Sequence, residues 1–138
     1  MAGTPTTQDR APGSLSSAIS NLVVRLVAEY TGRGPTKAKT SIRDNVVVCV
    51  TTENMTKGER RLVEAGEAAA VVTIRRKFQT TMRDDLVGGV EMLTGRSVVA
   101  FLSDHNAVTD HAVECFVLDG PPATQLAADD HHGAMDAA

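Results

Sequence analysis

Aromatic residues are scarce in this chain, at 3% of its 138 residues, and tryptophan is absent. Because hydrophobic residues still make up 42% of the chain, the core must be built from Val, Leu, Ile, Ala and Met. Proteins that bind single-stranded nucleic acids usually stack the bases on aromatic rings. The composition therefore argues against a nucleic-acid partner of that kind.

Cysteine is also rare, and long apolar runs are missing. Cys49 and Cys115 each lie in an apolar stretch typical of a strand, which favours buried reduced thiols, with a disulfide or a reactive thiol as the alternative. No run approaches the roughly 20 apolar residues of a membrane span, and the start lacks a signal-peptide pattern. We therefore expect a cytoplasmic protein without membrane insertion.

Net charge is lacking in the central part of the chain. The whole chain has a formal net charge of −3, yet residues 14–119 hold 13 basic and 13 acidic side chains. A neutral domain has no long-range field that attracts a polyanion, so recognition by charge must be local. Nucleic-acid binding through Lys37, Lys39 and Arg43 stays only as a third alternative, which predicts a steep loss of affinity with salt.

The length fits one domain between two segments without periodicity. Residues 1–13 and 120–138 are rich in small and polar residues and are predicted to be disordered tails. The folded domain is predicted to span residues 14–119. His131 and His132 fall in the second tail, where nothing would preorganise them as a metal site.

The first half of the domain is predicted to form a helix and a hairpin. Apolar residues recur on one helical face after a cap at Ser14 or Ser16, and Gly32 ends this helix. Residues 36–42 alternate between two faces and pair with a second strand over residues 46–50.

The second half is predicted to repeat this order. The capping box Thr56–Glu59 starts a long helix, which Gly88–Gly89 kinks or ends before a short last piece closes at Gly95. Strands 97–102 and 112–118, with a loop between them, form the second hairpin. The expected fold is an α+β two-layer sandwich, a four-stranded and mainly antiparallel sheet with helices on one face.

The segment Gly32–Thr40 concentrates glycines, cations and hydroxyl groups between the first helix and the first strand. Such a loop can present N–H groups and positive charge to an anion, although it lacks the spacing and context of nucleotide-binding loops. The alternative is a helix stop before an edge strand whose lysines discourage aggregation. The candidate residues for binding an anion or a partner protein are Arg33, Gly34, Thr36, Lys37, Lys39, Arg43 and Arg96.

A second polar cluster surrounds the last hairpin. Asp104, His105, Asp110, His111 and Glu114 lie within eleven residues and could ligate a divalent metal or carry acid–base chemistry. Their spacing matches no standard metal motif, and the two aspartates could instead cap turns. The candidate polar site comprises Ser103, Asp104, Asp110 and Glu114, and no cofactor is predicted.

A basic cluster in the predicted long helix is expected on its solvent-exposed side. Arg75, Arg76, Lys77 and Arg83 are typical of the wet face of a helix, where they pair with carboxylates. No site is predicted there.

Several segments together resemble one family of small bacterial proteins, the MpsC-like proteins, over residues 14–119. The segments are Gly32–Thr40, Arg75–Gln79, Leu93–Asp104, and the positions Asp110, Ala112, Glu114 and Phe116–Leu118. The resemblance implies a cytoplasmic accessory component linked to cation-translocating or inorganic-carbon-transport membrane proteins, and it brings no catalytic mechanism. The positions that it highlights are Gly32, Gly34, Pro35, Lys37, Thr94, Gly95, Arg96, Ser103, Asp104 and Glu114. His105 departs from the small or hydroxylated residue of the family pattern, so the resemblance gives it no role.

We therefore expect a non-enzymatic accessory or regulatory binding module that forms a homodimer and engages a small anion or a membrane transport protein. A sheet with helices on one face leaves an apolar face to cover, which suggests the dimer. The residues expected on that face are Val46, Val48, Val50, Val99 and Phe101. The alternative is a small metal-dependent or acid–base enzyme that uses the Ser103–Glu114 region.

Overall fold

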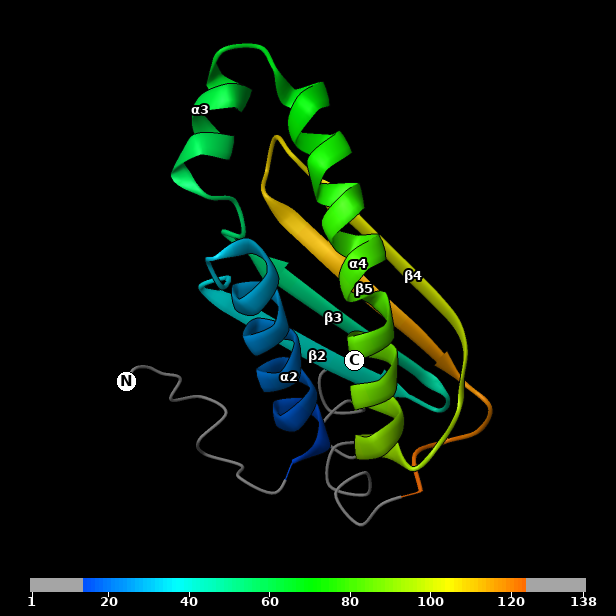
Figure 1. Cartoon of the computed structure of the whole chain (residues 1–138). Helices are drawn as coiled ribbons and strands as arrows, with labels where there is room; N and C mark the ends of the chain where they lie inside the picture. The colour runs from blue at the N-terminus through cyan, green and yellow to red at the C-terminus, as the bar shows by residue number, and fades with distance from the viewer. Residues whose placement is uncertain (1–13, 124–138) are drawn as a thin grey trace.

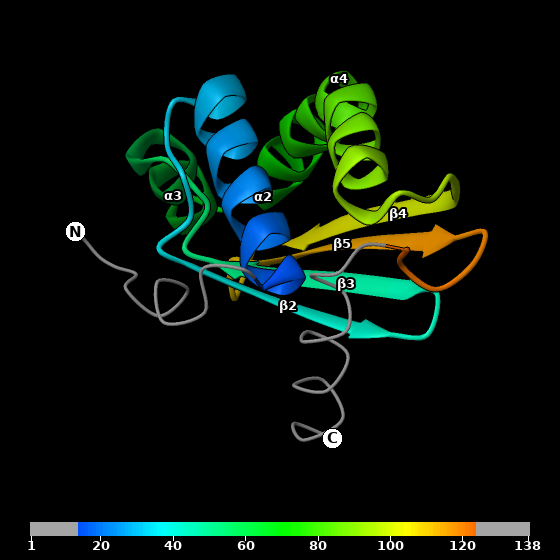
Figure 2. The same ribbon diagram turned by 90° about the horizontal axis from the view of Figure 1, so that it is seen from below.

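The computed structural model describes residues 14–123, so most of both predicted tails lies outside the described residues. Helices α2 (Leu15–Thr31) and α4 (Ala68–Thr94) lie side by side on one face of the sheet, and the shorter α3 (Lys57–Glu64) projects beyond one end (Figures 1 and 2). The strands of the sheet are β2 (Lys37–Arg43), β3 (Val46–Thr52), β4 (Val98–Asn106) and β5 (His111–Leu118). The predicted α+β two-layer sandwich is confirmed.

The sheet is antiparallel throughout, in the order β2–β3–β5–β4. Each sequence hairpin contributes one central strand, β3 or β5, and one edge strand, β2 or β4. Because side chains alternate along a strand, one set faces the helices and the other set faces away. We call these two sides of the sheet the covered face and the open face.

The core lies between the covered face and the two long helices. Helix α2 begins after Ser14, whose hydroxyl accepts the Ser17 N–H, and ends at Gly32 in the left-handed conformation (φ 84°), as predicted. Its apolar side packs on α4 and the sheet. The fully buried core side chains include Leu15, Ile19, Val23, Ile42, Val47, Leu86, Val90, Phe116 and Leu118.

The predicted long helix is in fact two helices. The capping box at Thr56 and Glu59 starts α3, which ends near Ala65, and the chain turns at Gly66 (φ 86°) before α4 begins. Gly88–Gly89 do not end the helix, because α4 continues through both glycines to Thr94 and is capped by Gly95, as predicted. A Cβ on Gly89 would come within 2.7 Å of Leu22 Cδ2, so this glycine lets α2 and α4 approach closely.

The last hairpin is longer than its sequence indicates. Strand β4 runs to Asn106, so the predicted loop shrinks to residues 107–110, and Ser103 and Asp104 pair with Glu114 and Val113 of β5. Asp and Asn have low strand propensity, but pairing with a central strand overrides that preference.

Candidate functional site

The backbone of the Gly32–Thr40 segment uses several of its own donors internally. The N–H groups of Gly32 and Arg33 donate to acceptors in α2, at 2.9 and 3.3 Å, and the N–H of Thr36 donates to Thr52 O at 3.1 Å. Gly34 packs against α2, because a Cβ there would meet a carbonyl oxygen of α2 at 3.4 Å. These three N–H groups are therefore not presented to an anion.

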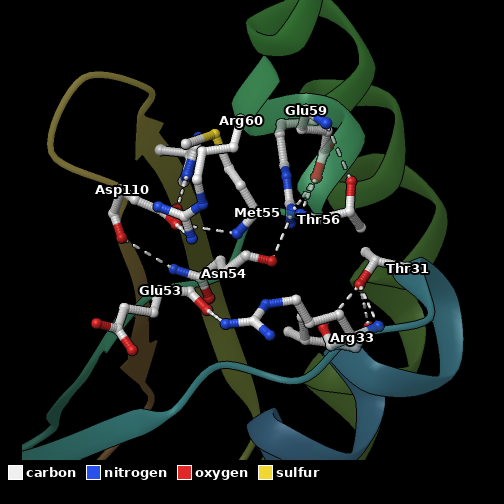
Figure 3. Close-up of polar contacts among 12 residues, drawn as sticks. Thr31, Arg33, Glu53, Asn54, Met55, Thr56, Glu59, Arg60 and Asp110 are labelled. Atoms are coloured by element: carbon white, nitrogen blue, oxygen red, sulfur yellow. Dashed lines mark hydrogen bonds and ion pairs between the residues drawn. The ribbon is translucent and has the colours of Figure 1, made fainter. Parts of the chain in front are cut away.

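The side chains of the same segment hold the connection between β3 and α3. Arg33 Nη2 donates to Glu53 O at 3.2 Å (Figure 3). The Thr36 hydroxyl donates to the Glu53 carboxylate. Glu53 has a positive φ of 58°, which is unusual for a residue other than glycine. Arg33 and Thr36 thus anchor a strained turn at this end of the sheet.

The cationic side chains predicted to bind fall in separate places. Lys37, Lys39 and Arg43 are exposed along the open face of edge strand β2, as the predicted alternation requires. Arg96 lies just before β4, at the edge of the sheet opposite β2, and its Nε donates to Pro121 O. The structure therefore brings Lys37, Lys39 and Arg43 together as a cationic edge and leaves Arg96 apart.

The predicted polar cluster of the last hairpin is divided into pairs, because Ser103 lies beside Glu114 and His105 contacts Asp110. Asp104 lies on the open face and accepts the His105 N–H at 2.9 Å, whereas Ser103 and Glu114 lie on the covered face. Asp110 lies at the turn and accepts the Met55 N–H. Within residues 14–123, no three His, Cys, Asp or Glu side chains are grouped so that they could hold a metal ion.

A buried ion pair joins α3 to α4, and the sequence interpretation missed it. Arg75 Nη2 donates to Glu59 Oε1 at 2.6 Å and to Asn54 O at 2.8 Å, with only 5% of Arg75 exposed. The assignment of Arg75 to the wet face is therefore wrong. The spacing of residues indicates this burial, because Arg75 lies on the same side of the helix as the apolar residues Val71 and Met82.

Asp110 connects the last hairpin to the start of α3 (Figure 3). Its carboxylate accepts the Met55 N–H at 3.0 Å, contacts His105 Nε2 at 2.8 Å and lies 3.6 Å from Arg60 Nη2. Burial alone would raise the pKa of Asp110, but the hydrogen bonds from His105 and Met55 outweigh burial and hold the pKa below its usual value. We call Asn54, Glu59, Arg75, His105 and Asp110 the buried polar network.

A row of polar side chains crosses the middle of the covered face. Thr40, Cys49, Glu114 and Ser103 are successive partners across the four strands, and Ser20 of α2 hydrogen-bonds Thr40 at 2.8 Å between their hydroxyl oxygens. This row places a carboxyl group beneath the helices.

Glu114 is the most perturbed group of that row, with 3% of its surface exposed. Burial raises its pKa from 4.5 to about 7, and the nearby Ser103 hydroxyl lowers it only in part. Neither Glu114 Oε1 nor Ser103 Oγ has a hydrogen-bond partner of normal geometry. Burial also raises the pKa of Cys49 to about 11, so this thiol stays protonated.

The open face has an apolar centre, and no element within residues 14–123 covers it (Figure 2). Both central strands contribute valines, and β4 adds Leu102, which is 59% exposed. The apolar side chains of this centre are Val46, Val48, Val50, Leu102, Val113, Cys115 and Val117. Both cysteines are free, and Cys115 lies on this face while Cys49 is buried on the other.

Three of the five residues predicted for an apolar face lie on the open face, namely Val46, Val48 and Val50. The prediction for Phe101 is wrong, because its ring packs against the core, with its centroid 5.1 Å from that of Phe116. Val99 is exposed at an irregularity of β4.

A comparison with known protein families shows to which family the chain belongs. The model of one family, described as the Na+-translocating membrane potential-generating system (MpsC), matches residues 11–120. The chain belongs to the MpsC family. No curated protein and no solved structure matches this MpsC-family chain. Among its described helices, none combines the length and the apolar character that a membrane crossing requires.

Proposed function

We propose that this MpsC-family chain is a non-enzymatic, cytoplasmic accessory module of a Na+-translocating membrane-potential-generating system. The family match supports the link to that system. The single structural observation that supports binding is the open face, whose apolar centre is bordered by the cationic edge of β2. Exposed apolar patches with a polar rim are typical of surfaces that bind other proteins.

We further propose that the chain is a homodimer and that two parts of this surface have different partners. A second copy covers the apolar centre. Lys37 and Arg43, at the two ends of β2, stay at the rim and engage an acidic segment of a membrane transport protein or a small anion. Arg33 and Thr36 support this surface indirectly, because they fix the turn beside it.

The membrane potential of cells tests this function. A host strain that lacks the chain should show a weaker Na+-dependent membrane potential, measured with a potential-sensitive dye, and the wild-type chain should restore it. The double variant Lys37→Glu and Arg43→Glu should fail to restore it while it keeps the wild-type melting temperature. A deletion without effect refutes the link to the system, and full restoration by the double variant refutes the role of the rim.

A small acid–base enzyme is the second candidate, and the raised pKa of Glu114 favours it. Asp104 and Asp110 point to other parts of the molecule, so Glu114 has only Ser103 beside it among the candidate polar residues. Glu114→Gln decides between the two functions. It should restore the membrane potential if the chain is a binding module, and it should fail to do so if Glu114 transfers protons.

A further inference from the structure

The charges of the open face are arranged in a way that selects the geometry of a dimer. Strand register places Lys39, Val50, Val113 and Asp104 in one row across the sheet. The row has a cation on edge strand β2, a carboxylate on edge strand β4 and two valines between them. Lys39 and Asp104 are both exposed.

We propose that two copies pack open face to open face, about a two-fold axis that runs parallel to the strands between β3 and β5. Rotation about this axis places each row over the same row of the partner in reverse order. Lys39 then lies over the partner's Asp104, and Val50 lies over the partner's Val113. This inference rests on the proposed binding module and specifies its homodimer.

The other two-fold arrangements of this surface bring like charges together. An axis that runs across the strands would place β2 over β2 and Lys37 over the partner's Arg43. Edge-to-edge pairing of β2 with a second β2 would also align the cationic edges. Like charges directly opposite each other are destabilising, so the charge pattern disfavours both arrangements.

The surface around Asp104 has room for a lysine side chain. A hollow of about 300 Å³ lies there, and its lining includes Val50, Asp104, His111 and Val113. Packed sheets cross at roughly 30°, which displaces the outer strands by only about 4 Å. A lysine can span that displacement, so the partner's Lys39 can enter the hollow and reach the carboxylate.

The size of the face predicts a dimer of modest strength. Four strands at about 4.8 Å spacing and seven residues at about 3.3 Å each give a footprint of roughly 440 Å² per copy. The two footprints together amount to roughly 880 Å², which is below the roughly 1,200 Å² at which stable protein–protein interfaces begin and is typical of weak, transient ones. We therefore expect dissociation on dilution.

Charge reversal on the full chain tests this geometry. Lys39→Asp and Asp104→Lys should each raise the dimer dissociation constant, measured by analytical ultracentrifugation, at least about tenfold. An equimolar mixture of the two variants should dimerise like the wild type, because both charge pairs of the mixed dimer are then opposite. Arg25→Asp on the exposed side of α2 makes the same change of charge and should leave the dissociation constant unchanged.

An ion pair within one copy cannot explain a return of dimerisation when the two variants are mixed. Lys39 and Asp104 are three strand spacings apart, about 14 Å, which is too far for a direct ion pair. The proposal is overturned if the wild type is monomeric at the highest soluble concentration, if the single variants dimerise normally, or if the mixture stays monomeric. A monomer that still restores the membrane potential through Lys37 and Arg43 would refute the dimer and leave the proposed function standing.

Discussion

A sheet usually buries apolar side chains on its covered face and exposes polar side chains on its open face. The two faces of this sheet depart from that pattern in opposite ways. The covered face buries a carboxyl group at its centre, since Glu114 is 3% exposed, whereas the open face leaves Val50 39% exposed and Leu102 59% exposed. Buried polar groups are costly unless they are paired, and exposed apolar groups are typical of interfaces. The helices therefore dictate which face is buried in the monomer, and the open face suits a partner.

The largest expected effect concerns the buried polar network. Arg75→Met should destabilise the protein by about 3–5 kcal/mol, because Glu59 would remain buried without its charge partner. Urea denaturation measures this change. Arg76→Met, at the exposed neighbouring position, is the control and should change the free energy of unfolding by less than about 0.5 kcal/mol. Equal effects of the two substitutions would contradict the assignment of Arg75 to the buried polar network.

Glu114 gives the next largest effect, and it depends on pH. The folded-state pKa of about 7 lies above the ordinary glutamate value of 4.5, so the folded protein binds this proton more tightly than the unfolded chain does. Stability should therefore fall as the pH rises from about 4.5 to about 7, by roughly 3 kcal/mol in all, and then level off.

Glu114→Gln should remove that loss and leave a variant that is more stable than the wild type at pH 8. Chemical denaturation at several pH values measures both proteins. Glu64→Gln, on the exposed surface of α3, is the control and should keep the wild-type pH dependence. A parallel pH dependence of the wild type and Glu114→Gln would show that the buried carboxyl group does not titrate in this range.

Two valines of β3 provide the smallest and most direct comparison of the faces. Val47 is fully buried on the covered face, and Val50 is 39% exposed on the open face. Val47→Thr should cost about 1–3 kcal/mol, because it buries a hydroxyl group, whereas Val50→Thr should change stability by less than about 0.5 kcal/mol. Thermal denaturation of the two variants, at a protein concentration low enough for the chain to be monomeric, measures the difference. Equal losses there would mean that Val50 is as buried within one copy as Val47.

Local signals in the sequence predict most of the fold. Ser14 and Gly32 bound α2 because caps and left-handed glycines act within a few residues. The alternation of side chains along residues 36–42 predicts that the lysines of β2 share one face, because successive residues of a strand point to opposite sides. The division between α3 and α4 at Gly66 was not predicted, because several positions around this glycine can continue a helical stripe.

The candidate site was harder to predict because it depends on contacts far apart in the sequence. Ser103 and Glu114 become neighbours only through the register of β4 and β5. Arg75 and Glu59 meet only because α3 folds back against α4. The valines of β3 occur on both faces, so the strand sequence alone does not distinguish the buried face from the open one.

The reactivity of Cys115 tests the central claim, that a second copy covers the open face, most directly. Cys115 lies on that face, and Cys49 is buried within the core of the same chain as an internal control. The rate of alkylation by iodoacetamide should be measured on the full chain over a dilution series. Cys115 should react several-fold more slowly at high protein concentration than at low concentration, while Cys49 stays unreactive throughout. A rate for Cys115 that does not change with protein concentration would contradict the claim.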